Sequence, residues 1–216
     1  MKISILKILS RAAAFEIDEE TASPYYSQKP YQVWLNRQNL GEEGRNTFSL
    51  FDLEPDKTYD LELIRDSDVL LNCQFSTPPE SRLLDIRSFG AEAGGSASCT
   101  AAIQAAIAAC PPGGTVRIPP GIYRTGPLFL HSDMLLYLEQ GAVLLGSTDL
   151  NDYPILPGML AQANPEEECN LGTWEGNPLD CYASLITLIE ASRAAIAGPG
   201  SIDANAQQSV WWKNPK

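Results

Sequence analysis

Short runs of alternating apolar and polar residues occupy the first part of the chain, and polar turns separate one run from the next. The runs lie at residues 3–6, 13–17, 31–35, 47–51, 59–64 and 69–75. Alternation with a period of two indicates β-strands that bury one face, and several such strands at this spacing are typical of a small antiparallel sandwich. Residues 76–79 (STPP) follow as a stiff linker, so the pattern predicts a first domain over residues 1–82.

The segment 53–61 (LEPDKTYDL) places a leucine and a proline shortly before Tyr59. It resembles the fibronectin type III signature, although Lys57 stands where a threonine is usual. The resemblance implies a tyrosine corner, in which the Tyr59 ring is buried and its hydroxyl group hydrogen-bonds back to the chain. We interpret this domain as a structural spacer. The alternative is sugar binding by exposed aromatic side chains, for which the candidates are Tyr25, Tyr26 and Trp34.

An alanine-rich stretch follows the linker at residues 98–110 and predicts a helix, which Ser98 or Thr100 can cap. A Pro-Pro-Gly-Gly sequence ends it. Ile103 and Ile107 lie one turn apart on one face of this helix. The apolar stripe they form predicts that the helix covers a hydrophobic end of the fold, because a helix buries such a face against a partner.

The remaining sequence has the pattern of a solenoid. Very short apolar strands lie at residues 115–119, 127–130, 135–138 and 142–146, and glycine or polar corners separate them. Short strands without intervening helices favour a solenoid over a doubly wound sheet. Residues 130–143 can be aligned with residues 189–202 at a constant offset of 59 residues, as two coils of one solenoid would require. Residues 147–183 between them are predicted to form a long loop, and such loops often carry function.

Composition restricts the classes of function. Fifteen Lys and Arg residues against 27 Asp and Glu residues give a net charge of −12, which argues against a general nucleic-acid binder because such proteins neutralise phosphates. No apolar stretch approaches the roughly 18 residues of a membrane-spanning helix. Lys7 and Arg11 interrupt the apolar N-terminus, which we interpret as a strand rather than a signal peptide. We therefore expect a cytoplasmic protein that binds neither nucleic acid nor membrane.

The five cysteines are thinly spread and give no zinc-binding spacing. Cys99 and Cys110 flank the predicted helix, which would hold them about 16 Å apart and beyond disulfide reach. Cys169 and Cys181 lie in one loop and could pair, although nothing in the sequence requires it. We interpret all five as thiols in a reducing compartment.

Several short sequence segments after the linker are similar to segments of the polygalacturonase family of glycoside hydrolases. They are residues 101–107 (AAIQAAI), 112–123 (PGGTVRIPPGIY), 126–130 (GPLFL), 138–144 (LEQGAVL) and 198–203 (GPGSID). The pair Trp211-Trp212 also stands where such enzymes commonly carry two tryptophans, whereas Cys99 departs from the acidic sequence usual before the helix. The resemblance implies an all-β protein: a fibronectin type III-like sandwich over residues 1–82, then the first coils of a right-handed parallel β-helix with an N-terminal capping helix over residues 83–216.

The family cuts pectin by inverting hydrolysis, and the resemblance implies catalytic Asn-Thr-Asp, Asp-Asp and Gly-His motifs and a substrate-binding Arg-Ile-Lys motif. None is present here. Phenylalanine follows Asn46-Thr47, leucine precedes His131, and proline follows Arg117-Ile118. We therefore expect no catalytic, cofactor-binding or metal-binding residue in these 216 residues. The chain is expected to be an inactive N-terminal fragment of a hydrolase whose catalytic carboxylates lie beyond Lys216.

Other residues that could be taken for catalytic groups are interpreted here as structural. Asp149, Asp152, Asp180 and Asp203 occupy predicted loops and corners, where aspartates accept turn hydrogen bonds. His131 precedes a serine and an aspartate, but adjacent residues in a turn seldom face one another as a Ser-His-Asp triad requires.

A tryptophan pair and a run of three glutamates are also interpreted as structural. Trp211 and Trp212 are expected to pack against the coil end, with sugar stacking as the alternative. Residues 166–168 (EEE) are expected to be solvated loop.

The expected partner of the complete protein is a pectic oligo- or polysaccharide. Galacturonan is a polyanion, whereas residues 83–216 carry 13 acidic and 6 basic groups, so a local basic cluster elsewhere would have to hold it. Two alternatives remain open. One is another pectin-active β-helix enzyme, either a rhamnogalacturonan hydrolase or a lyase, although the Ca²⁺-binding carboxylates and the arginine base of a lyase are not visible. The other is a non-catalytic β-helix for binding or assembly.

Overall fold

In the computed structural model, residues 1–19, 23–161, 169–208 and 210 are described. The chain divides into two compact units, and the division falls between Arg82 and Leu83. Each unit has its own hydrophobic core. Within these described residues, the fold is all-β apart from one α-helix and short 3₁₀ turns. None of the helices among the described residues is long and apolar enough to cross a membrane.

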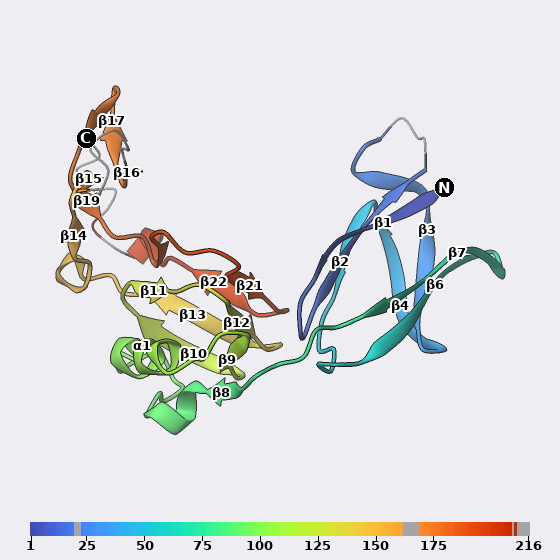
Figure 1. Cartoon of the computed structure of the whole chain (residues 1–216), viewed down its shortest axis with the longest axis horizontal. Helices are drawn as coiled ribbons and strands as arrows, with labels where there is room; N and C mark the ends of the chain where they lie inside the picture. The colour runs from blue at the N-terminus through green and yellow to red at the C-terminus, as the bar shows by residue number, and fades with distance from the viewer. Residues whose placement is uncertain (20–22, 162–168, 209, 211–216) are drawn as a thin grey trace. The chain divides into compact units, whose positions relative to one another are not determined.

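The first unit consists of two antiparallel sheets (Figure 1). The three-stranded sheet has the order β1 (Lys2–Ile8), β2 (Ala13–Asp18), β5 (Thr47–Leu50). The four-stranded sheet has the order β4 (Gln38–Arg45), β3 (Tyr26–Leu35), β6 (Thr58–Arg65), β7 (Asp68–Ser76). Alternate residues of these strands face inward, and their aromatic rings join the two sheets: Phe15 of β2 lies 5.2 Å from Phe75 of β7 between ring centroids.

The predicted tyrosine corner is confirmed. Tyr59 is 5% exposed, and its hydroxyl oxygen accepts a hydrogen bond of 2.7 Å from the backbone N–H of Glu54. The bond ties the start of β6 to the turn before it, at the segment that carries the sequence resemblance. The assignment of the whole unit to the fibronectin type III class stays a prediction.

Strand β4 was not predicted from the sequence. Its eight residues, QNLGEEGR, show no apolar alternation, because the strand lies at the edge of its sheet and every residue in it is exposed or half-buried. Hydrogen bonding to β3 defines it instead. Charged side chains on an edge strand discourage pairing with other chains.

The second unit is a stack of coils in a parallel β-helix, which confirms the predicted fold class (Figure 1). One sheet has the order β21 (Ala195–Ala197), β12 (Met134–Leu138), β9 (Gly114–Ile118), β8 (Leu83–Asp85). The second has the order β10 (Gly121–Thr125), β13 (Ala142–Gly146), β22 (Ser201–Asp203), and the third pairs β11 (Leu128–Leu130) with β20 (Ile186–Leu188). Short 3₁₀ turns lie at Ile86–Phe89, Leu150–Asp152 and Ala206–Gln208.

The register between coils differs slightly from the predicted offset. Val143 pairs with Ser201, and Leu144 with Ile202, so the separation in this sheet is 58 residues rather than 59. The predicted offset would have paired the buried Leu144 with Asp203. The observed pairing instead aligns two apolar side chains, so that the apolar faces of the strands match between coils.

The long loop between the coils contains regular structure that the sequence did not predict. Its chain runs out and back as an arm of two-residue antiparallel strands (Figure 1). The pairs are β14 (Ile155–Leu156) with β19 (Cys181–Tyr182), β15 (Met159–Leu160) with β16 (Cys169–Asn170), and β17 (Thr173–Trp174) with β18 (Asn177–Pro178). Strands this short carry no readable alternation. All five cysteines of the chain lie in the described part, and none forms a disulfide, Cys169 and Cys181 included.

Helix α1 (Thr100–Ala108) covers the first coil, as predicted. Ile103 and Ile107 are fully buried in the same core cluster as Val116 and Leu128 of the coil. The predicted cap is wrong: the N-cap residue is Cys99, and it makes no side-chain capping bond. The Thr100 hydroxyl oxygen instead accepts a bond of 2.7 Å from the backbone N–H of Gly126, which fastens the helix to a corner of the coil.

One side chain of α1 also hydrogen-bonds to the backbone at the edge of a strand. The Gln104 amide donates a 3.0 Å hydrogen bond to the carbonyl oxygen of Phe129 and accepts a 2.9 Å bond from the N–H of the same residue. Phe129 is the central residue of β11, whose other edge pairs with β20. Gln104 thus takes the place of a neighbouring strand at the end of the solenoid.

We expect Gln104→Leu to lower the free energy of unfolding by about 1–3 kcal/mol, because it leaves a backbone donor and acceptor without a partner. Urea unfolding followed by circular dichroism measures the loss, and hydrogen exchange at the Phe129 amide reports its location. Gln140→Leu, at an exposed corner, is the matched control and should change stability by no more than about 0.5 kcal/mol. Equal stability of both variants, with unchanged exchange at Phe129, would contradict the role given to Gln104.

Candidate functional site

All four candidate aspartates accept hydrogen bonds, and the predicted turn bonding is confirmed for Asp149, Asp152 and Asp203 but not for Asp180. The Asp149 carboxylate accepts a 2.9 Å hydrogen bond from the N–H of Asn151 and begins the 3₁₀ turn there. Asp152 accepts one of 2.5 Å from the Ser147 hydroxyl group. The corresponding bonds of Asp180 and Asp203 come from the backbone N–H groups of Gly158 and Asn205, at 2.8 Å and 2.7 Å. The Asp180 carboxylate is bound across the arm, because Gly158 lies 22 residues earlier in the chain.

His131, Ser132 and Asp133 do not form a catalytic triad. The imidazole nitrogens of His131 lie 2.8 Å from the carbonyl oxygen of Ser132 and 2.9 Å from that of Ile107. The Ser132 hydroxyl oxygen accepts a bond of 3.0 Å from the N–H of Ser192. Asp133 forms an ion pair with Arg193, and the hydrogen bond from that guanidinium lowers the pKa of the Asp133 carboxyl group below its ordinary value. These three side chains therefore link α1 and successive coils.

Arg117 begins the incomplete Arg-Ile-Lys motif, and its side chain forms ion pairs within the fold. Its guanidinium lies 2.6 Å from the Asp85 carboxylate and 3.2 Å from that of Glu139. Asp85 is paired with Arg87 as well, at 2.7 Å. Hydrogen bonds from Arg87 and then Arg117 hold the pKa of Asp85 well below its ordinary value, against the opposing effect of burial. This cluster joins β8 and β9 to the corner after β12.

The sign of the Asp85 shift sets an expected pH dependence. Because its pKa is lowered by folding, the stabilisation is complete above the ordinary aspartate pKa of about 3.9 and is lost as the pH falls below it. The stability difference between the wild-type chain and Asp85→Asn should therefore be largest near neutral pH and shrink toward about pH 2. Urea midpoints at several pH values measure it. Asp66→Asn, whose side chain is 78% exposed, is the control and should show no such trend.

A pocket of about 470 Å³ lies at the base of the arm, beside the last described coil. Its walls are Tyr153, Tyr182, Ala183, Ser184, Leu185, Ala204 and Ala206. The Tyr153 hydroxyl group donates a 2.9 Å bond to the carbonyl oxygen of Ser147, and burial raises its pKa. The lining contains aromatic and small side chains and no carboxylate, so the pocket can contact a ligand but cannot supply an acid or a base. The sequence analysis missed it; the tyrosines at both ends of the long loop were the available signal.

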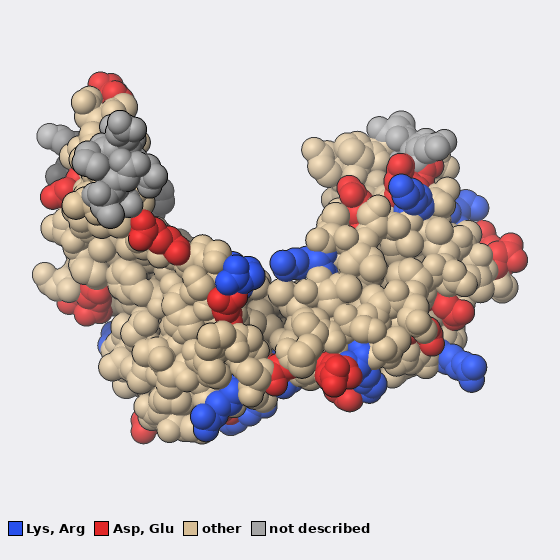
Figure 2. Space-filling view, in the orientation of Figure 1, with Lys and Arg blue, Asp and Glu red and all other residues tan. Residues whose placement is uncertain are grey.

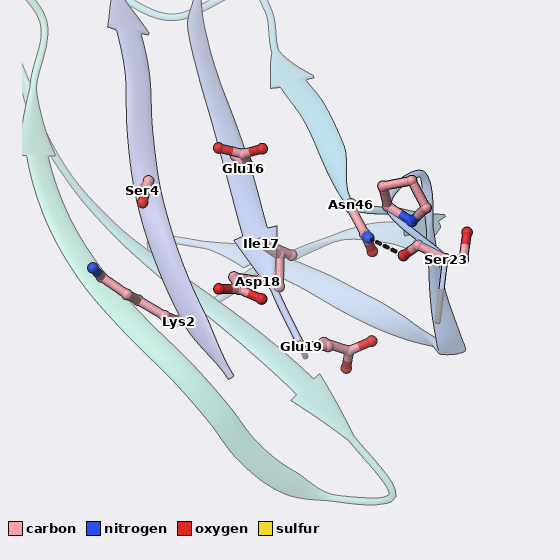
Figure 3. A pocket seen from close by; sticks show the side chains of 9 residues that line it. Lys2, Ser4, Glu16, Ile17, Asp18, Glu19, Ser23 and Asn46 are labelled. Carbon is pink, nitrogen blue, oxygen red and sulfur yellow. Dashed lines mark hydrogen bonds between the residues drawn. The ribbon is translucent and has the colours of Figure 1, made fainter. Parts of the chain in front are cut away.

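Another pocket, of about 420 Å³, lies on the first unit (Figure 3). Glu16, Asp18, Glu19 and Lys2 line it, and the Glu19 carboxylate is paired with Arg65 at 2.7 Å. The Asn46 amide donates a 3.1 Å hydrogen bond to the carbonyl oxygen of Ser23 at its rim. Since Glu16 and Asp18 offset Lys2, the lining offers no excess of positive charge for an anionic sugar.

Figure 2 shows where the charged side chains of the described residues lie on one face. On the face shown, Lys and Arg side chains lie singly or beside Asp and Glu on each unit. The candidate residues Trp211, Trp212 and Glu166–Glu168 lie outside the described residues. Among the described residues, no cluster of three or more His, Cys, Asp and Glu side chains could hold a metal ion.

No protein-family model matches the chain. An exo-poly-α-D-galacturonosidase of Dickeya chrysanthemi is 36% identical over 130 residues, which cover 60% of this chain and 21% of that protein. An endo-polygalacturonase of Pectobacterium parmentieri is 25% identical over 127 residues, covering 55% of this chain and 29% of that protein. Among solved structures, a family 28 exopolygalacturonase of Yersinia enterocolitica superimposes on 94% of this chain and 41% of its own, with a TM-score of 0.62 and 24% identity.

The chain thus spans between a fifth and a third of the length of the two curated relatives. The predicted resemblance to polygalacturonases is confirmed by these matches. The structural superposition confirms the fold.

Proposed function

We propose that this chain is the N-terminal portion of a polygalacturonase-like glycoside hydrolase that acts on pectic poly- or oligosaccharides by inverting hydrolysis. The observation that carries the proposal is the 36% identity over 130 residues to an exo-poly-α-D-galacturonosidase. The coils of the second unit, and the parallel pairing that joins them, agree with such a scaffold.

Inverting hydrolysis requires a carboxylic acid and a carboxylate on opposite sides of the scissile bond, roughly 6.5–9.5 Å apart. The four candidate aspartates of this chain accept hydrogen bonds within the fold, and Arg117 is held in ion pairs. In the proposal, the acid, the base and the basic residues that hold the galacturonate carboxylate come from residues outside these 216. The described coils supply the strands onto which further coils stack.

The test is to express the open reading frame that contains these residues together with all sequence continuous with it. Reducing ends released from polygalacturonate should rise with time, and nuclear magnetic resonance should show β-anomers as the first product of the α-linked substrate. Retention of the α-anomer would contradict inversion. Unsaturated products detected by their ultraviolet absorbance would favour a lyase, and binding without cleavage would favour a non-catalytic module.

A further inference from the structure

The outer face of the four-stranded sheet in the first unit carries a row of polar side chains around one tryptophan. By strand register, Trp34 of β3 lies beside Asn39 of β4 and Glu62 of β6, and Glu62 lies beside Asn72 of β7. These side chains are exposed or half-buried, whereas their chain neighbour Val33 is buried in the core. The row therefore points away from the core and crosses all four strands.

A shallow groove of about 440 Å³ continues from this row over β6 and β7. Its lining is Arg37, Asp60, Leu61, Glu62, Asn72, Cys73 and Gln74. The Gln74 amide donates a 2.8 Å hydrogen bond to the Asp60 carboxylate. Among the described residues, the Arg37, Glu62 and Asn72 side chains have no hydrogen-bond partner, so their donors and acceptors face the groove's solvent.

The tryptophan is held in place by its neighbours. Its indole N–H donates a 3.2 Å hydrogen bond to the Gln32 side-chain oxygen, which also accepts a bond of 3.4 Å from the Asn39 amide. A ring fixed in this way presents a flat apolar surface next to amide and carboxylate groups. Sugar rings are the complementary shape, because they carry C–H bonds on one face and hydroxyl groups around the edge.

Charge and length define the ligand further. The groove and row contain the carboxylates of Asp60 and Glu62 and one guanidinium group, Arg37, which disfavours a polyanion such as galacturonan. Four strands at about 4.8 Å spacing give a row of about 14 Å, the length of roughly three sugar rings. We propose that this face of the first unit binds a neutral, hydroxyl-rich polysaccharide. The site is independent of the proposed hydrolase chemistry.

The test uses the 216-residue chain in native gels that contain galactan, arabinan, xyloglucan or hydroxyethylcellulose, with polygalacturonate as the anionic comparison. At least one neutral polysaccharide should retard the wild-type chain, and Trp34→Ala should weaken its affinity at least tenfold. Trp34→Phe should retain part of the binding, and Asn72→Ala should lose several-fold. Trp174→Ala removes a tryptophan that is 65% exposed on the arm, and this matched control should bind as the wild-type chain does.

Circular dichroism of each variant establishes that it is folded. Should Trp34→Ala fail to fold, Asn72→Ala and Gln74→Ala alter exposed positions of the groove and serve as the deciding pair. The proposal is overturned if no neutral polysaccharide retards the wild-type chain. It is also overturned if folded groove variants bind unchanged, or if polygalacturonate alone causes retardation. None of these readouts involves turnover, so each is independent of whether the complete protein is a hydrolase.

Discussion

Polygalacturonate incubated with the purified 216-residue chain is expected to release no reducing ends above a buffer blank. A general acid and a general base each contribute about 10²–10⁴-fold to such a reaction, and each of the four candidate aspartates already accepts a hydrogen bond within the fold. Asp152 and Asp180, for example, are held by Ser147 and by Gly158. A reducing-sugar assay over long incubation, beside an active polygalacturonase, provides the measurement.

Release well above the blank would contradict this expectation. Single substitutions Asp149→Asn, Asp152→Asn, Asp180→Asn and Asp203→Asn would then identify the carboxylate responsible, since each preserves the size of the side chain. The control for folding is the thermal unfolding transition of each variant, which a change of catalytic function alone would leave in place.

Ile107→Asp should lower the free energy of unfolding of the second unit by about 3–5 kcal/mol. Ile107 is fully buried between α1 and the first coil, and aspartate there would be a charge without a partner among apolar neighbours. Urea unfolding followed by circular dichroism gives the value. The same substitution at Ile122, which is 45% exposed on β10, is the matched control and should cost less than about 1 kcal/mol. A loss at Ile107 no larger than at Ile122 would show that the helix does not seal the coil.

The strongly patterned elements could be predicted from the sequence. The alanine-rich helix has two isoleucines on one face, and a Pro-Pro-Gly-Gly sequence ends it, so its existence and its buried side followed from local chemistry. The same is true of β9 and β12, which are apolar runs bounded by corners. Tyr59 was identified by the short signature around it, and its hydrogen bond to Glu54 is present.

What could not be predicted depends on tertiary pairing. Strand β4 is defined by its hydrogen bonds to β3, and its residues carry no alternation. The arm strands are two residues long, which is too short for any period. The Thr100 hydroxyl group bonds Gly126 rather than capping the helix, and only the folded coil brings that N–H within reach. The pocket at the base of the arm could not be predicted for the same reason, because its lining residues Tyr153 and Tyr182 are distant in sequence.

Because Gln104 bonds to β11, the two ends of the described solenoid differ. At this end, the helix and its glutamine occupy the edge of the first coil, and β8 occupies the edge of β9. On the last described strands, by contrast, Leu188, Ile196 and Ile202 are 45%, 43% and 44% exposed. The described stack therefore has one covered edge and one edge that bears exposed apolar side chains. A ribosome delivers the sealed end first, so each coil that emerges during synthesis meets a finished surface on which to fold.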